Sequence, residues 1–246
     1  MFNKQVPNWM ESLPPICAAL RAAPEQSGVL VGRLLAAGVW SELREWASGL
    51  LTYPMAGYRG KQFEELGPHV ACVLAGAANL GDTELSSAVV GFLCQDDDDL
   101  IGCAMSTLRA AATRGTGDHG GTVLDTVAKH AAGRLERRLA QPVRAADDWS
   151  IRLLKGCDCE LCATLGEFLG DPARRSLEWP LAEQRRRHVH SRIDQADLPV
   201  DHQTRRSGRP YTLVLHKTDA LFEREHEVRR RDRDDLAWLT RTGLVR

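Results

Sequence analysis

Apolar side chains recur every three or four positions through most of residues 14–140, a period typical of amphipathic helices rather than strands. Candidate helices lie at 61–78, 83–94, 97–112 and 122–139. Upstream of them, a short apolar helix from Val29 stops at Gly38, and a second apolar helix covers 39–50. Helices joined by short loops pack as antiparallel pairs. We therefore expect a mainly α fold built on an antiparallel helical array, of which an irregular α-solenoid is the extended form.

The pattern of long apolar helices ends near residue 145. The stretch 141–149 is too polar for a core element, and Pro142 cannot continue the helix that precedes it. Beyond this stretch the elements become shorter and more mixed in type. We predict a helical-repeat-like domain over 1–145, followed by a small Cys/His-containing α+β module over 146–246.

The C-terminal module is expected to combine helices with one β-hairpin. A short helix is predicted at 160–169 and a basic helix at 181–196. The segments 200–206 and 211–217 flank a Ser-Gly-Arg-Pro turn, and the second contains a β-favouring Tyr-Thr-Leu-Val-Leu run, so they should pair as a hairpin. A long charged helix follows over 220–241. Its sparse apolar side consists of Leu221, Phe222, Val228, Leu236 and Leu239.

Charge and composition argue against several classes of protein. The chain carries 32 Lys and Arg against 33 Asp and Glu, so it lacks the strongly basic balance of a dedicated nucleic-acid binder. No run of about 18 apolar residues is present, so no membrane-spanning segment is predicted. The seven cysteines are odd in number, and no secretory leader is recognisable. We therefore expect a reduced, cytoplasmic compartment, where clustered cysteines favour metal or redox chemistry over disulfides.

Three cysteines fall within six residues, and this cluster is the strongest chemical signal in the chain. Cys157, Cys159 and Cys162 offer three thiolates at the spacing of a turn, and His188 or His190 could supply a fourth ligand. Thiolates and imidazoles are the ligands that zinc binds tetrahedrally. The cluster therefore predicts a zinc site. Two other interpretations stay open: plain reduced thiols at a helix start, or thiols with a redox or nucleophilic role.

Arginines gather in two places in the same module. The basic helix contains Arg185, Arg186, Arg187 and Arg192, and the hairpin contains Arg205, Arg206 and Arg209. Guanidinium groups bind phosphates in a bidentate manner, so these residues form a candidate surface for anions or nucleic acid. The alternative is a solvated helix face paired with nearby acids, and we prefer this interpretation of the basic helix.

Four consecutive aspartates, Asp96 to Asp99, precede the apolar Leu100 and Ile101. Clustered carboxylates can hold a hard cation, but acidic residues also favour the first turn of a helix, where the helix dipole attracts negative charge. We interpret this run as a helix N-terminus.

The order of motifs in the C-terminal module resembles that of a known group of proteins. Cys-x-Cys-x-x-Cys from Cys157 is followed by Leu-x-x-Phe-Leu-x-Asp-Pro from Leu165, Arg-Arg-x-His-x-His from Arg185 and Gly-Arg-Pro-x-Thr-Leu-Val from Gly208. This order is similar to a C-terminal module of large bacterial and fungal proteins. In those proteins the module follows helical repeats and an N-terminal prolyl-hydroxylase-like Fe(II)/2-oxoglutarate oxygenase domain.

The oxygenase domain itself is not part of this resemblance. Such enzymes hold iron with a His-x-Asp/Glu…His triad, and the chain has no His-x-Asp or His-x-Glu sequence. The resemblance therefore implies a companion region without oxygenase activity, and an oxygenase becomes a reasonable protein partner.

Three functions follow as expectations, in order of preference. The first is a non-catalytic interaction or scaffold protein whose C-terminal module is stabilised by a metal, with zinc as the expected ion. The second is a nucleic-acid-binding module that uses the basic helix and the hairpin. The third is a thiol-dependent redox enzyme that uses one of the clustered cysteines.

Overall fold

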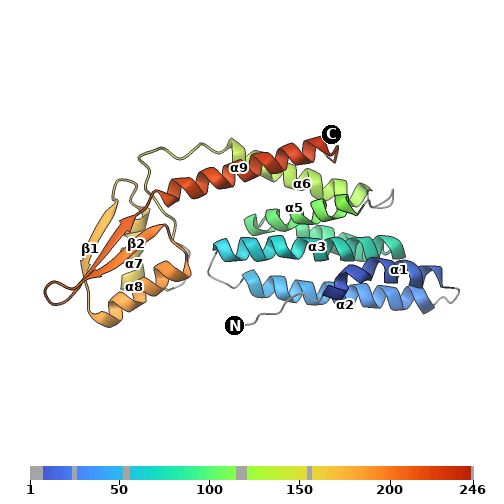
Figure 1. Ribbon diagram of the computed structural model, residues 1–246, viewed down its shortest axis with the longest axis horizontal. Coiled ribbons are helices and arrows are strands. Elements are labelled where there is room, and N and C mark those ends of the chain that lie inside the picture. Colours follow the sequence, from blue (N-terminus) through green and yellow to red (C-terminus); the bar gives the residue numbers. More distant parts are fainter. Residues whose placement is uncertain (1–7, 24–26, 52–55, 115–120, 154–156, 245–246) are drawn as a thin grey trace. The chain divides into compact units, whose positions relative to one another are not determined.

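A computed structural model describes residues 8–23, 27–51, 56–114, 121–153 and 157–244 (Figure 1). The described residues are mainly helical and include a small antiparallel sheet, which confirms the predicted fold class. The helices are η1 Asn8–Ser12, α1 Leu13–Ala22, α2 Ser27–Leu51, α3 Ala56–Leu80, α4 Thr83–Leu93, α5 Asp98–Thr113, α6 Gly121–Ala140, α7 Glu160–Gly170, α8 Glu183–Gln195 and α9 Ala220–Arg241. The strands are β1 Ser176–Pro180, β2 Val200–Arg205 and β3 Thr212–Lys217.

The chain forms two compact units. The helical unit comprises Met1–Tyr53, Tyr58–Arg138 and Asp234–Arg246. The mixed unit comprises Pro54–Gly57 and Leu139–Arg233. Helix α9 therefore contributes its first part to the mixed unit and its last turns to the helical unit. None of the described helices combines the length and the hydrophobicity that crossing a membrane requires.

The helical unit is an antiparallel array around one continuous core. Figure 1 shows α2 and α3 running in opposite directions, as α5 and α6 do. The apolar faces predicted from the helical period meet in the interior of this array. Its largest fully buried side chains are Leu13, Phe63, Leu66, Leu93, Leu100, Met105, Leu108 and Leu135.

Helix α2 contains a glycine, Gly38, that was predicted to end a helix. The predicted helix stop at Gly38 is wrong, because α2 continues through it to Leu51. A glycine inside a helix costs about 0.5–1 kcal/mol relative to alanine. Burial of Val39 and Trp40 directly after Gly38 offsets this cost.

The aspartate run begins a helix, in agreement with its interpretation from sequence. The carboxylate of Asp97 caps α5 by accepting a hydrogen bond of 2.9 Å from the backbone N–H of Asp99. Arg134 crosses from α6 and donates to the carbonyl oxygens of Gln95 at 2.7 Å and Asp97 at 2.9 Å. Its guanidinium also lies 2.8 Å from the carboxylate of Asp98. The acidic turn is thereby tied to the neighbouring helix.

The close approach of α3 and α5 requires a residue without a side chain at position 67. A Cβ on Gly67 would lie 2.4 Å from Ser106 Cβ and 2.7 Å from the backbone nitrogen of Thr107. Because backbone cannot move aside as a flexible side chain can, Gly67→Ala is expected to destabilise the helical unit by about 1–3 kcal/mol in chemical denaturation. Gly91→Ala is the matched control, since a Cβ there would meet nothing within 4 Å. A Gly67 variant as stable as the Gly91 variant would contradict this packing.

The mixed unit contains a three-stranded antiparallel sheet in the order β1-β3-β2. The hairpin predicted from segments 200–206 and 211–217 is present as β2 and β3. The strand β1 was not predicted; it pairs with β3 so that Leu177 lies opposite Leu215 and Trp179 opposite Leu213. One face of the sheet packs in a core with α7 and α8. That core consists of Ile151, Leu165, Phe168, Leu169, Leu177, Leu181, Val189, Ile193, Val200, Leu213 and Leu215.

A buried lysine fixes the end of α7 to the sheet. Lys217 is fully buried on β3, and its Nζ donates to the carbonyl oxygens of Leu169 at 3.0 Å and Asp171 at 2.7 Å. These carbonyls lie at the C-terminus of α7, where a cation is favoured by the helix dipole. Burial lowers the pKa of Lys217. The lysine therefore has a structural role.

The predicted apolar side of α9 is partly wrong. Val228 is 45% exposed, whereas Leu239 is fully buried in the core of the helical unit. Leu221 and Phe222 are half-buried, and the Phe222 ring meets Trp149 edge-on at a centroid distance of 4.8 Å. The predicted apolar residues of α9 are therefore packed near its two ends and not at its middle.

Candidate metal centre

The three clustered cysteines lie at the beginning of α7. Cys159 is the N-cap residue of this helix and has an extended backbone conformation, with φ −77° and ψ 158°. Cys162 lies in the first turn and is buried, whereas Cys157 precedes the helix and is exposed. A thiol before the helix, one at its cap and one in its first turn can all face the same point in space.

Helix α8 brings His188 to these thiols. His188 Nε2 lies 3.4 Å from Cys159 Sγ and 3.3 Å from Cys162 Sγ. The ligand atoms of Cys157, Cys159, Cys162 and His188 all lie within 4.8 Å of one another. No other group of three or more potential metal ligands gathers in this way within the described part of the chain.

The spacing of the four ligand atoms fits one tetrahedral ion. Sulfur and nitrogen ligands at about 2.0–2.3 Å from a zinc ion lie about 3.5–3.8 Å apart at tetrahedral angles. The two sulfur-to-nitrogen distances are within a few tenths of an ångström of this range. All four ligand atoms lie within 4.8 Å of one another, so Cys157, Cys159, Cys162 and His188 could hold a metal ion.

Local electrostatics favour a thiolate on Cys159. Attraction from the backbone N–H of Cys162 and from the Cys157 thiol lowers the pKa of Cys159 to about 6, although no conventional hydrogen bond caps the helix. Burial, followed by the neighbouring Cys159 sulfur, raises the pKa of Cys162 to about 11. A bound cation would reverse the second effect, because a thiol that coordinates a metal is deprotonated outright. The set would then supply three thiolates and one neutral imidazole.

His190, the other candidate ligand, lies away from the thiols. Its Nδ1 lies 2.5 Å from Nδ1 of His202, and its Nε2 lies 3.2 Å from Thr204 Oγ1. His202 in turn contacts the carboxylate of Asp194 at 3.1 Å. Sequence reasoning missed this chain of polar side chains. Its only signal was the spacing of His190 and Asp194, four residues apart on one helix face.

The seven arginines proposed for anion binding have different environments. Arg186 is buried, donates to the carbonyl oxygen of Leu181 and lies 5.2 Å from the centroid of the Tyr211 ring. Burial among these partners gives Arg186 a structural role and turns it away from solvent. Arg192 is half-buried on the same helix.

Two of the remaining arginines form ion pairs with carboxylates of their own unit. Arg187 lies 3.0 Å from Glu183, and Arg205 binds both carboxylate oxygens of Glu178. Arg185, Arg206 and Arg209 are exposed. The structure thus leaves fewer exposed, unneutralised arginines than the sequence suggested.

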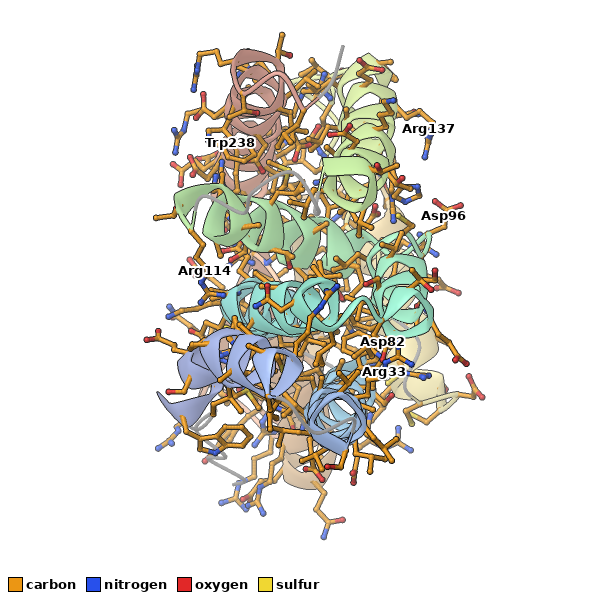
Figure 2. All side chains as sticks on the ribbon, turned by 90° about the vertical axis from the view of Figure 1, so that its right-hand side faces the viewer. Arg33, Asp82, Asp96, Arg114, Arg137 and Trp238 are labelled. Carbon is orange, nitrogen blue, oxygen red and sulfur yellow. The ribbon has the colours of Figure 1, made fainter. Side chains whose placement is uncertain are left out.

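The helical unit contains a separate groove of about 570 Å³. Its walls are rich in alanine, including Ala71, Ala75 and Ala78, and Asp82 lies among its lining residues. Figure 2 shows Arg33 beside Asp82, and their charged groups are 3.8 Å apart. Among the residues that line it, no pair of catalytic acid and base is present.

No protein-family model, curated protein or solved structure matches this chain. Its function must therefore be inferred from the geometry of the four-residue Cys/His cluster and from the surfaces of the two units.

Proposed function

We propose that the mixed unit is a zinc-stabilised module and that the protein acts as a non-catalytic interaction protein. The observation that carries the proposal is the convergence of Cys157, Cys159, Cys162 and His188 on one point from two helices. Three thiolates and one imidazole are a ligand set typical of structural zinc sites.

A structural role for the ion agrees with the number of protein ligands. Catalytic zinc sites keep one position open for water or substrate, whereas structural sites fill all four positions with side chains. Here four side chains are available, and they join the start of α7 to α8. The ion would fasten these helices together at one edge of a small core.

Exposed apolar residues on α2 support an interaction role. Leu30 is 61% exposed, Val31 52% and Leu34 66%, and their spacing puts them on adjoining parts of one helix surface. Contiguous exposed apolar residues of this kind mark protein-binding surfaces. The resemblance of the C-terminal module to oxygenase-associated proteins makes an Fe(II)/2-oxoglutarate oxygenase the first partner class to test.

Elemental analysis of purified protein tests the metal. We expect about one zinc per chain, because four ligands complete one tetrahedral site. Cys159→Ser should remove most of this zinc, since a serine hydroxyl is a poor ligand for it. Cys94→Ser is the matched control, because Cys94 is a partly buried cysteine of the helical unit outside the cluster. It should retain the full zinc content.

Three results would count against the zinc module. Purified protein that is folded but contains no metal would end the proposal. Visible absorption from iron, in place of colourless zinc, would assign the cluster to a different ion. Rapid alkylation of one cysteine in the protein as purified, with no chelator added, would favour the thiol-dependent enzyme, because thiol reactivity follows the thiolate fraction and a bound ion would shield the thiolates.

A further inference from the structure

The strand β2 forms an outer edge of the three-stranded sheet. In the order β1-β3-β2 it pairs only with β3, over the register from Val200 opposite Lys217 to Arg205 opposite Thr212. Val200 donates its N–H to the carbonyl oxygen of Leu198. Among the described residues, none outside β3 forms a hydrogen bond with the backbone of 201–205. The outward backbone groups of β2 therefore offer donors and acceptors to another strand.

The other edge of the sheet is formed by β1, and it is protected against pairing with a further strand, whereas the β2 edge is not. β1 ends at Pro180, which has no N–H to donate, and Arg174 donates to the carbonyl oxygen of Ser176 at 3.3 Å. Proline, bulges and rows of charged side chains, especially lysine, are usual means by which proteins block edge strands, whereas Asp201 and Arg205 of β2 carry opposite charges. β2 has the sequence Val-Asp-His-Gln-Thr-Arg, with no proline, glycine or lysine.

The exposed side chains of β2 are self-complementary. Alternate residues of a strand point to the same face, and Asp201, Gln203 and Arg205 are all exposed. If a second β2 lies antiparallel with the two-fold axis at Gln203, Asp201 of each copy faces Arg205 of the other. Opposite charges that face each other across antiparallel strands stabilise the pair.

We propose that the β2 edge binds the β2 edge of a second copy of this chain. The result would be one continuous six-stranded sheet, with three strands from each copy. A two-fold axis brings the same patch of both copies together, so the patch must complement itself. The order of acid, amide and base along β2 meets that condition. The pairing of the two edges does not depend on zinc binding by the Cys/His cluster.

Arg205 already has one carboxylate partner within its own chain, Glu178. Glu178 binds Arg205 on the same exposed face of the sheet, and the hydrogen bond and charge of Arg205 lower the pKa of Glu178. Asp201 has no ion-pair partner among the described residues of its own chain. In the dimer Arg205 would lie between two carboxylates, and each Asp201 would gain a partner.

Sedimentation of the full chain tests the proposal. We expect a species of twice 27.2 kDa that dissociates on dilution. Asp201→Arg places two arginines opposite each other at both symmetric contacts, and Arg205→Asp places two aspartates there. Each variant alone should dimerise at least about tenfold more weakly than wild type. Asp147→Arg makes the same charge change at an exposed site outside the sheet and should leave the dimer unchanged.

Mixing the two variants makes the test specific. In a mixed pair, the Asp201→Arg chain presents arginine at both charged positions of β2, and the Arg205→Asp chain presents aspartate at both. Every arginine then faces an aspartate, so the mixture should dimerise more tightly than either variant alone. A wild-type chain that stays monomeric would overturn the proposal. A peptide from a different protein would then be the remaining candidate to pair with the β2 edge. A dimer that neither variant weakens would place the interface elsewhere and would overturn it too.

Discussion

Removing the metal from the purified protein is expected to unfold the mixed unit while the helical unit stays folded. Structural zinc sites contribute on the order of 10 kcal/mol of apparent binding free energy at neutral pH. This is comparable with the whole stability of a domain, about 5–15 kcal/mol. The mixed unit has a modest core of its own and four side chains that the ion would hold together. Without the ion, three thiols and an imidazole no longer fasten α7 to α8.

Hydrogen exchange read out by mass spectrometry checks this result unit by unit. After treatment with a strong chelator, peptides from β3 and α8 should exchange quickly, while peptides from α5 keep their protection. Adding zinc back should restore protection in the mixed unit. If the mixed unit keeps full protection without metal, its core alone stabilises it, and the proposed role of the ion is wrong.

Phe168→Ala is expected to destabilise the mixed unit by about 3–5 kcal/mol, the usual cost of removing a buried aromatic ring. Phe168 is 1% exposed and lies in the core with Leu165 and Leu169. Its ring also lies 4.9 Å from Nζ of Lys217. The substitution would open a cavity and remove the ring face that contacts a buried cation, which adds roughly 0.5–1 kcal/mol or more.

Exchange of the slowest amides in the mixed unit, measured with zinc bound, gives this free energy directly. They should exchange roughly a hundredfold to a few thousandfold faster. Phe92→Ala is the control, because Phe92 packs against Trp40 in the helical unit. It should leave the slow amides of the mixed unit unchanged. A Phe168 variant that matches this control would show that the α7 core is not as closely packed as described.

Helix positions were largely predictable because hydrophobic period depends on sequence alone. The prediction of 83–94 corresponds to α4 Thr83–Leu93, and that of 220–241 to α9 Ala220–Arg241. The error at Gly38 arose because a local helix breaker was given more weight than burial on both sides of it. Ala36 and Val39 are buried in the same core, and that tertiary packing is invisible in local propensity.

The strand β1 could not be found from its own residues. It is short, follows two arginines and ends in Pro180, so its sequence is typical of a loop. Only Leu177 and Trp179 face the core, and their role becomes evident only when β3 is beside them. Because β1 depends on pairing with β3 and not on its own composition, no local sequence pattern predicts it.

The cysteines of the candidate metal centre were evident from spacing, whereas the sequence offered His188 and His190 without deciding between them. Successive helical residues turn by about 100°, so His188 and His190 lie on opposite sides of the buried Val189. Which side meets the cysteines depends on where α7 packs. The structure puts α7 on the side of His188 and leaves His190 to β2. Tertiary packing therefore decides which histidine reaches the cysteines, and the local sequence pattern does not reveal it.

Helix α9 has a consequence for how the chain folds during synthesis. Leu239, fully buried in the core of the helical unit, comes from a segment that leaves the ribosome after all of Leu139–Arg233. The mixed unit is therefore translated in full before the helical unit receives its final helical turns. Although domains generally fold as they emerge, the helical unit, which begins first, cannot complete its core before the mixed unit has been synthesised. A nascent chain halted before Asp234 would hold a complete mixed unit beside an array that still lacks Leu239.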